Sequence, residues 1–387
     1  MKLFTKNVLA LLAFSLCLAG CSPVSDSDIS WGPGESGGPG EGGGPGEGQP
    51  GVITAGEWSD LDNWTFWESV LLREDFEGYP DYWNFHPRHR IDVAVTGTDG
   101  LPVVNETVTV SRNGTALCQG RTNNKGIVHL WVDLFQKSSG VDYSGLTLAI
   151  RGIKSEEPVT PYSEGINRIT VDPKPVQNRV EIAFTVDATG SMGDELEYLK
   201  MELVDVIGRA QGENPEISIH TSAVFYRDEG DEYVTRVSPF STDVATTVNF
   251  IKNQRAAGGG DYPEAVHTAL EKTLNELQWS DEARAKIVFL LLDAPPHYQP
   301  GVIASLQSSI RKAMEQGIRL IPITASGTDK PTEFLMRFFA VSTGGTYVFI
   351  TDHSGIGNEH LEPSVGEYQV EFLNNLMVRL IGRYSEN

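Results

Sequence analysis

In the stretch Ile182-Ala183-Phe184-Thr185-Val186-Asp187-Ala188-Thr189-Gly190-Ser191-Met192, an apolar run ends in an acidic residue followed by two hydroxyl side chains. Apolar runs of this length are typical of parallel strands that are covered on both faces. A second run, Ile287 to Leu292, ends in Asp293. Ligands of open α/β sheets bind beyond the carboxyl ends of the strands, so both aspartates lie where a binding site is expected.

The sequence around these two runs alternates between strand and helix patterns from Arg179 onward. Further strands are expected at 217–226, 318–324 and 346–350, and helices where apolar residues recur every three or four positions. The helix patterns are Leu196/Leu199/Leu203/Val206, Val302/Leu306/Ile310/Met314 and Tyr368/Phe372/Leu376/Leu380. The predicted fold class for residues 176–387 is therefore α/β, with a doubly wound, open and mostly parallel sheet.

Oxygen-bearing side chains in three loops of this domain suit a hard cation. The first loop offers Asp187, Thr189 and Ser191, and Asp293 follows the second apolar run. Between them, Gly258-Gly259-Gly260-Asp261-Tyr262-Pro263-Glu264-Ala265 opens another predicted helix. The sequence predicts that these loops meet at one edge of the sheet and bind a metal ion.

These motifs resemble those of the von Willebrand factor type A family over roughly residues 178–385. Asp187, Thr189 and Ser191 match the Asp-x-Ser/Thr-x-Ser motif of the metal-ion-dependent adhesion site (MIDAS), and Asp293 matches the family's later acidic residue. The resemblance implies a bound Mg²⁺, or Mn²⁺ or Ca²⁺ in its place. It also implies a protein partner whose carboxylate fills the open coordination position.

The second loop departs from the family pattern. The family's threonine, two residues after the aspartate of Gly-Gly-Asp, is replaced by Pro263, which has no side-chain ligand. We expect Asp261 to contribute instead, with Asp228 as the alternative.

Ser191 also allows a different interpretation. The sequence Thr189-Gly190-Ser191-Met192-Gly193 nearly matches the Gly-x-Ser-x-Gly nucleophile elbow of α/β-hydrolases, with His267, His297 or His353 as the base. The first glycine is missing, however, and Asp187 has a role only in the metal interpretation. We therefore expect a binding protein and no enzyme, and leave adhesion and permanent envelope assembly open.

Residues 1–20 predict an export signal. They combine Lys2 and Lys6 with an apolar run too short to span a bilayer. The next residues, Leu18-Ala19-Gly20-Cys21, resemble the lipobox of bacterial lipoproteins, which implies cleavage before Cys21 and its lipidation. Ser22 stands where an aspartate would resemble an inner-membrane retention signal. This favours the outer membrane and leaves the membrane face open.

Three segments are expected between the signal and the α/β domain. Residues 21–51 are a linker in which Gly-Pro-Gly-Glu starts at Gly32, Gly38 and Gly44. Residues 52–88 are rich in aromatic side chains, which form either a stacking surface or, as we favour, a cluster in which a helix near 61–72 packs on the next domain. Residues 89–175 alternate with period two and predict a small antiparallel β-sandwich.

The sandwich also carries a resemblance. Its turns Asp99-Gly100-Leu101-Pro102 and Thr122-Asn123-Asn124-Lys125-Gly126 resemble those of carboxypeptidase-regulatory-like or bacterial Ig-like modules. Such modules space out surface proteins.

The charge of the whole chain limits its partners. With 52 acidic and 30 basic residues, the formal net charge is −22, which argues against nucleic acid as a ligand. An anionic lipid surface would also repel the chain, so any membrane attachment is expected to come from acyl groups.

Overall fold

The computed structural model describes residues 50–213 and 215–386. The predicted signal, the lipidation site Cys21 and nearly all of the predicted linker lie outside these residues. Among the described residues, no helix is long and apolar enough to cross a bilayer.

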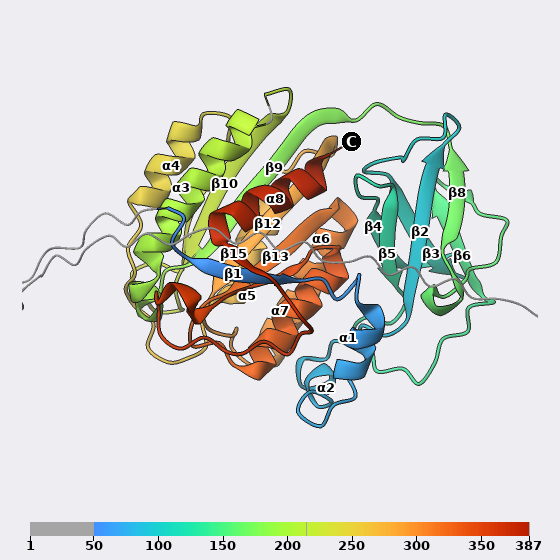
Figure 1. The fold of residues 1–387 in the computed structure, drawn as a ribbon. Coiled ribbons are helices and arrows are strands. Elements are labelled where there is room, and N and C mark those ends of the chain that lie inside the picture. The colour runs from blue at the N-terminus through green and yellow to red at the C-terminus, as the bar shows by residue number, and fades with distance from the viewer. Residues whose placement is uncertain (1–49, 214, 387) are drawn as a thin grey trace, which may run out of the picture. The chain divides into compact units, whose positions relative to one another are not determined.

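An eight-stranded sheet forms the centre of the fold, in the order β11-β10-β9-β12-β13-β14-β1-β15 (Figure 1). The strands from β10 to β14 pair in parallel, whereas the edge strands pair antiparallel. The inner strands are β9 Gln177–Asp187, β10 Ser218–Tyr226, β12 Ala283–Leu292, β13 Ile318–Thr324 and β14 Tyr347–Ile350; the edge strands are β11 Thr235–Ser241, β1 Thr54–Trp58 and β15 Val370–Phe372. The predicted α/β fold class is confirmed.

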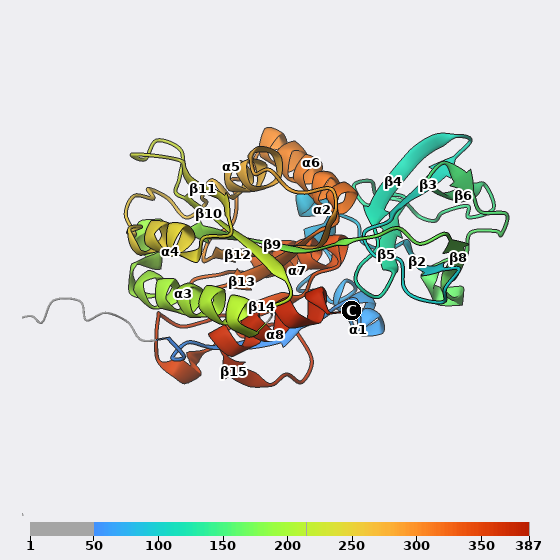
Figure 2. The same cartoon turned by 90° about the horizontal axis from the view of Figure 1, so that it is seen from above.

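Helices cover both faces of this sheet (Figure 2). In β12, Ile287, Phe289 and Leu291 point to one core, and Val288, Leu290 and Leu292 point to the other, because side chains alternate along a strand. The first core is completed by α3 Leu196–Glu213, α4 Val244–Lys252 and α8 Leu373–Ser385, and the second by α5 Val266–Glu271, α6 Pro300–Gln316 and α7 Lys330–Thr343.

The C-terminal helix begins later than the sequence pattern predicted. Tyr368 and Phe372 share the spacing of Leu376 and Leu380, but α8 begins at Leu373. The prediction is wrong there because Val370–Phe372 forms β15, which pairs with β1 at the edge of the sheet. The Tyr368 ring instead packs edge-on against Phe349, with the ring centroids 4.8 Å apart.

Residues 89–175 form two small sheets that enclose their own core. One sheet has the order β5-β2-β8 and the other the order β4-β3-β6-β7. Buried Ile91, Val93, Val108, Val110 and Leu130 lie between them. One pairing, β2 with β8, is parallel, whereas the sequence predicted antiparallel strands only. The strands are β2 Arg90–Gly97, β3 Thr107–Arg112, β4 Thr115–Arg121, β5 Ile127–Trp131, β6 Leu146–Ile150, β7 Ile153–Lys154 and β8 Asn167–Val171.

The aromatic-rich segment 52–88 packs on the α/β domain. It contains strand β1 and two short helices, α1 Trp64–Val70 and α2 Tyr79–Trp83. Trp67 stacks on Phe334, and Phe85 stacks on Phe338 with 4.3 Å between the ring centroids. This burial supports the packing interpretation over a stacking surface. Because β1 lies between β14 and β15, the chain contributes to the large sheet both before and after the sandwich.

A buried ion network fixes this segment. The guanidinium of Arg337 in α7 donates to both carboxylate oxygens of Asp60, at 2.7 and 2.8 Å. It also contacts Glu333 and the carbonyl of Ser364. Burial alone would lower the pKa of Arg337, but Asp60 and Glu333 hold it above its usual value. The buried guanidinium of Arg337 therefore depends on its two carboxylate partners.

We expect Arg337→Met to lower the free energy of unfolding by about 3–5 kcal/mol, because it leaves the Asp60 and Glu333 carboxylates buried without their partner. Chemical denaturation monitored by circular dichroism measures the change. Arg73→Gln is the matched control, since the Arg73–Asp75 pair of the same segment is about half exposed and should contribute less than about 1 kcal/mol. Equal effects of the two changes would contradict the assignment.

Candidate metal centre

The predicted site residues lie at the switch point of the sheet. The chain passes from β9 to β10 on one side, and β12 adds to β9 on the other. Asp187 ends β9, and Asp293 follows β12 directly. The two strands are hydrogen-bonded neighbours in parallel, so the two aspartates leave the sheet at the same edge.

Hydrogen bonds join the side chains of the first loop to one another, and Asp293 lies beside them. Oδ1 of Asp187 accepts from the backbone N–H of Thr189 at 2.9 Å and from its hydroxyl at 2.7 Å. The Thr189 hydroxyl lies 3.1 Å from that of Ser191, and Ser191 is close enough to Asp293 to limit the rise in the pKa of that carboxyl. Asp187, Thr189, Ser191 and Asp293 are thus brought together as the sequence predicted.

Three buried carboxyl groups at this edge each keep one oxygen without a hydrogen-bond partner. These atoms are Oδ2 of Asp187, Oδ1 of Asp293 and Oε2 of Glu264. Burial raises the pKa of Asp187 to about 6, of Asp293 to about 7 and of Glu264 to about 9, and repulsion among the carboxylates adds to each shift. Unpartnered buried oxygens of like charge are costly unless a cation lies among them.

Glu264 is the residue that sequence reasoning missed. The side chain of Asp261 is exposed, whereas Glu264 is buried, and Asp187, Asp228 and Asp293 all raise its pKa. The backbone N–H of Glu264 donates to the carbonyl of Pro295, which joins the second loop to the one after Asp293. The sequence did contain a sign that Glu264 is the more buried of the two. Glu264 directly precedes the apolar pair Ala265-Val266, whereas Asp261 follows three glycines.

Glycines let the second loop approach the first. Gly258 accepts a hydrogen bond from the N–H of Gly190 at 3.0 Å, and Gly259 has φ +71°. A Cβ at position 259 would lie 2.8 Å from Glu264 Oε1 and 3.3 Å from the Cβ of Thr189. Any larger residue would therefore push Glu264 away from the hydroxyls of the first loop.

Asp228 has a partner of its own. Its Oδ1 lies 2.8 Å from Nε2 of His297, and its backbone N–H donates to Asp231. Asp231 also accepts from the N–H of Gly259 at 2.9 Å. Asp231 therefore joins the backbone of Asp228 to the second loop. The alternative site residue Asp228 is thus close enough to repel Asp187 and Glu264, but one of its oxygens is engaged.

The Tyr226 hydroxyl and the Glu195 carboxylate complete the surroundings of the site. The Tyr226 hydroxyl is buried close to Asp187, but no hydrogen bond of good geometry joins them. Glu195, in the turn after the first loop, accepts from the N–H of Ser326 at 3.1 Å and lies 3.1 Å from Nε2 of His360. Glu195 is buried too, its Oε2 lacks a hydrogen-bond partner, and its charge adds to the rise in the pKa of Asp293.

The donor set fits a hard cation of the Mg²⁺ type. It combines two hydroxyls with carboxyl groups, and oxygen ligands of this kind suit Mg²⁺, Mn²⁺ and Ca²⁺. Within residues 50–213 and 215–386, no three His, Cys, Asp or Glu side chains are placed to hold an ion by themselves. A metal site here would include the hydroxyls of Thr189 and Ser191 as well as carboxyl groups.

Comparisons with known proteins found one family model and several similar proteins. The model of the von Willebrand factor type A domain matches residues 181–360. A putative ariadne-like RING finger protein of Acanthamoeba polyphaga mimivirus is 34% identical over 120 residues, which are 31% of this chain and 11% of that protein. Alpha-protein kinase vwkA of Dictyostelium discoideum is 29% identical over 120 residues, covering 30% of this chain and 19% of the kinase.

The chain thus spans less than a fifth of the length of either relative. Among solved structures, conserved hypothetical protein BatB from Bacteroides thetaiotaomicron is similar with a TM-score of 0.37 and 12% identity. That similarity covers 54% of this chain and 100% of BatB.

We expect Asp293→Asn to stabilise the protein in the presence of a chelator, and to do so more strongly as the pH rises. The pKa values of Asp187, Asp293 and Glu264 are raised, so the native state binds more protons than the unfolded state between about pH 4 and pH 9. The stability of the metal-free wild type therefore falls as the pH rises through this window.

The measurement is the difference in melting temperature between Asp293→Asn and wild type, taken at several pH values from 5 to 9. A difference that shrinks with rising pH would contradict a raised pKa of Asp293 in the native state.

Proposed function

We propose that the von Willebrand factor type A domain at residues 181–360 binds a protein partner through a divalent cation. Asp187, Thr189, Ser191 and Asp293 would hold the ion, with Glu264 or Asp261 contributing from the second loop. The observation that carries the proposal is the set of unpartnered oxygens on buried Asp187, Asp293 and Glu264. Domains of this family commonly bind a divalent metal and take part in protein interactions.

The bound ion would supply a local positive charge that an acidic side chain of the partner can reach. Ser191 is exposed, whereas Asp187 and Thr189 are buried, so the site opens to solvent on the side of the Ser191 hydroxyl. A chain with a net charge of −22 would otherwise repel an acidic partner. Recognition should therefore require the cation, and the partner should offer a carboxylate.

The contacts of Ser191 favour this function over hydrolysis. Its hydroxyl is hydrogen-bonded to Thr189 and lies near Asp293, and both residues belong to the predicted metal site. Of the histidines considered as a base, His297 contacts Asp228 and His267 lies 3.7 Å from Glu229. We accordingly propose binding without catalysis, and a hydrolase that uses Ser191 is the alternative.

We also propose that the chain is a lipid-anchored protein of the bacterial envelope, with Cys21 as its lipidated residue. The basis is the sequence Leu18-Ala19-Gly20-Cys21 after a short apolar run. Where the described chain begins, the Glu202 carboxylate accepts from the N–H groups of Gly51, Val52 and Ile53 at 2.9–3.2 Å. A linker that ends at residue 51 would thus meet the fold at one fixed point.

The metal site is tested by thermal unfolding with and without Mg²⁺, Mn²⁺ or Ca²⁺. A ligand at 100 times its dissociation constant stabilises the native state by about 2.7 kcal/mol, so the wild type should melt at a higher temperature with metal. Asp187→Ala should abolish the increase. Asp172→Asn, which removes an exposed carboxylate of the sandwich, is the matched control and should respond as wild type does. A wild type that ignores all three cations overturns the proposal.

The same assay identifies the second-loop residue. We expect Glu264→Gln to weaken the response to metal and Asp261→Asn to leave it unchanged, because Glu264 is the buried one of the two. The reverse result would restore Asp261 to the site.

Partner capture from detergent-solubilised membranes tests the function beyond the metal. Proteins that bind the wild type, are lost with chelator and are lost with Asp187→Ala support a metal-bridged contact. A complex that survives both treatments would indicate assembly through another surface.

We expect Cys21→Ser to move the protein from the membrane fraction to the soluble fraction, because its acyl chains are the proposed anchor. Cys118→Ser is the matched control and should stay with the membranes. Immunoblots of the separated fractions measure this, and digestion of intact cells with protease reports the membrane face. A Cys21→Ser variant that stays in the membrane fraction would contradict lipid anchoring.

A further inference from the structure

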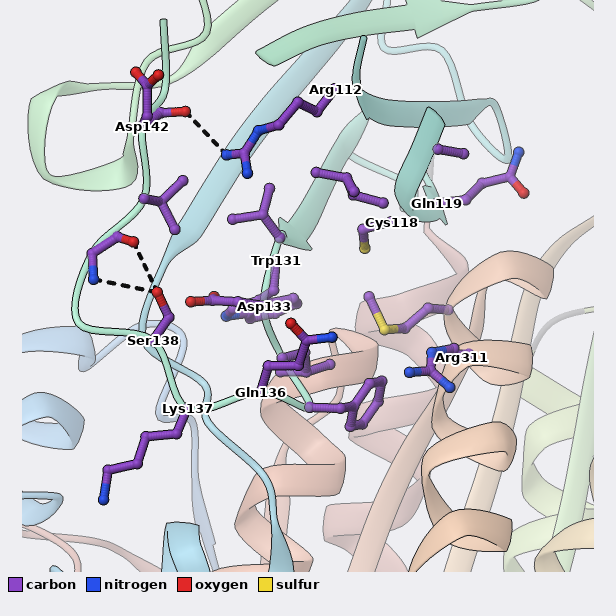
Figure 3. A pocket seen from close by; sticks show the side chains of 18 of the residues that line it. Arg112, Cys118, Gln119, Trp131, Asp133, Gln136, Lys137, Ser138, Asp142 and Arg311 are labelled. Atoms are coloured by element: carbon purple, nitrogen blue, oxygen red, sulfur yellow. Dashed lines mark hydrogen bonds between the residues drawn. The ribbon is translucent and has the colours of Figure 1, made fainter. Parts of the chain in front are cut away.

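A cavity of about 600 Å³ lies between the sandwich and helix α6, beside Trp131 (Figure 3). Charges of both signs line it in equal number, so the cavity selects neither anions nor cations. The charged lining residues are Arg112, Lys137 and Arg311, and Asp133, Asp142 and Glu315. The buried charges beside the first metal loop are more specific.

One histidine lies between two carboxylates in the chain that links β14 to β15 (Figure 1). Nδ1 of His360 lies 2.7 Å from Oδ1 of Asp352, and Nε2 lies 3.1 Å from Oε1 of Glu195. The second contact is ionic, because its geometry is not that of a hydrogen bond. Both ring nitrogens thus face carboxylate oxygens, and only the imidazolium form carries a proton on each of them.

The two carboxylates differ in how much they depend on His360. The side chain of Asp352 is 61% exposed, so water can solvate it. The side chain of Glu195 is 1% exposed and its Oε2 has no hydrogen-bond partner. Within the described parts of the chain, His360 is the only basic side chain in contact with the Glu195 carboxylate. A buried carboxylate without a cation is costly, so Glu195 needs the charge of His360.

Two further contacts join the same segment to the first metal loop. Gly357 has φ +83°, and a Cβ there would collide with Oε1 of Glu195. The side-chain amide of Asn358 donates to Oδ2 of Asp194 at 2.7 Å. Asp194 ends the turn Gly190–Asp194, which contains Ser191, and Glu195 follows it. Residues 352–360 therefore hold the turn that carries part of the metal site.

We propose that residues 352–360 form a pH-sensitive latch on the first metal loop, which is closed while the His360 imidazole is protonated and loosens when it loses its proton. Deprotonation removes the positive charge between Asp352 and Glu195 and leaves the Glu195 carboxylate buried without a cation. The regulation of the metal centre that this implies rests on the proposed function, whereas the latch itself does not.

The direction of the pH effect follows from the surroundings of His360. Burial alone would lower its pKa, but Glu195 and Asp352 hold the pKa above the usual value of 6.5. The native state therefore binds this proton more tightly than the unfolded chain does. The stability that the proton adds is complete below about pH 6.5 and is lost as the pH rises through the higher pKa of His360.

Neighbouring groups change charge in different ways over this pH range. Hydrogen bonds from His360 lower the pKa of Asp352, and the charge of His353 adds to this effect, so Asp352 stays ionised. The pKa of Asp293 is about 7, and the charge of Glu195 contributes to that rise. Because Asp293 titrates in the same range as His360, a variant must separate the two.

Hydrogen–deuterium exchange of the full-length protein tests the latch, with a chelator present and rates corrected for the intrinsic pH dependence of exchange. Two amides report on it, because the His360 N–H donates to Asp352 and the Ser326 N–H donates to Glu195. We expect the protection of peptides containing these amides to fall about threefold or more between about pH 5.5 and pH 8.5. Peptides of the central strand β12 should keep their protection.

Variants assign the effect to one residue. His360→Gln should abolish the pH dependence and give low protection of the reporter peptides at every pH, because glutamine carries no charge. His353→Gln is the matched control, since it removes an exposed histidine of the same segment, and should behave as wild type does. Asp293→Asn should keep the pH dependence, and melting curves confirm that each variant is folded.

Several outcomes would overturn the proposal. These are protection of the reporter peptides that does not change with pH in the wild type, full pH dependence in folded His360→Gln, or an equal loss of protection in β12. Loss of the pH dependence in Asp293→Asn, with its retention in His360→Gln, would assign it to the metal centre. Because the test runs without metal, the latch can fail while the metal-dependent function holds, and the reverse is equally true.

Discussion

The repulsion among three buried carboxyl groups at the end of β9 and β12 is the constraint around which the α/β domain is built. Asp187, Asp293 and Glu264 are nearly inaccessible to solvent, and each keeps an oxygen that nothing in the described protein satisfies. A loosely packed sheet would relieve this repulsion by separating the strands. Here two continuous hydrophobic cores hold β9 and β12 in register, so the strain stays in place for a ligand to relieve.

Ionic contacts near the start of the described chain differ from the metal centre, because their carboxylates have partners and stabilise the fold. Asp60 is paired with Arg337, and Glu57 on β1 with Arg379 and Arg383 of α8, which keep the pKa of Glu57 below its usual value despite burial. Glu202 accepts three backbone N–H groups. Together these carboxylates fix the first residues of the described chain to its last helix and sheet edge. A force along a linker before residue 51 would then act on the large sheet and not on the sandwich.

The central strands of this fold could be predicted from the sequence because Asp187 and Asp293 each follow a long apolar run. The runs before Asp187 and Asp293 predicted buried parallel strands, and the rule for open sheets placed their acidic ends together. Edge strands were harder to predict from the sequence, because they pair with strands that are distant along the chain. Strand β1 contains Gly56, has little apolar character, and finds β14 and β15 only at the other end of the chain. The step-four pattern through Tyr368 and Phe372 failed for the same reason, since pairing with β1 replaced the first helical turn.

The second loop of the metal centre shows a different limit of sequence reasoning. Comparison with the family motif pointed to positions 261 and 263 as the ligand positions of the second loop. In the structure, the buried carboxyl group of that loop is Glu264. That burial follows from a bridge to Pro296 and from left-handed glycines at 258 and 259, and neither is visible from residue types alone. The cavity beside Trp131 was likewise beyond reach, because its walls come from β4, the end of β5 and α6, which no local pattern brings together.

Proton and metal binding compete at the metal centre, and this competition follows from the burial of its carboxyl groups. The raised pKa values of Asp187 and Asp293 favour protonation at low pH, and a cation must displace those protons to bind. Binding of a partner carboxylate through the ion should therefore strengthen with rising pH.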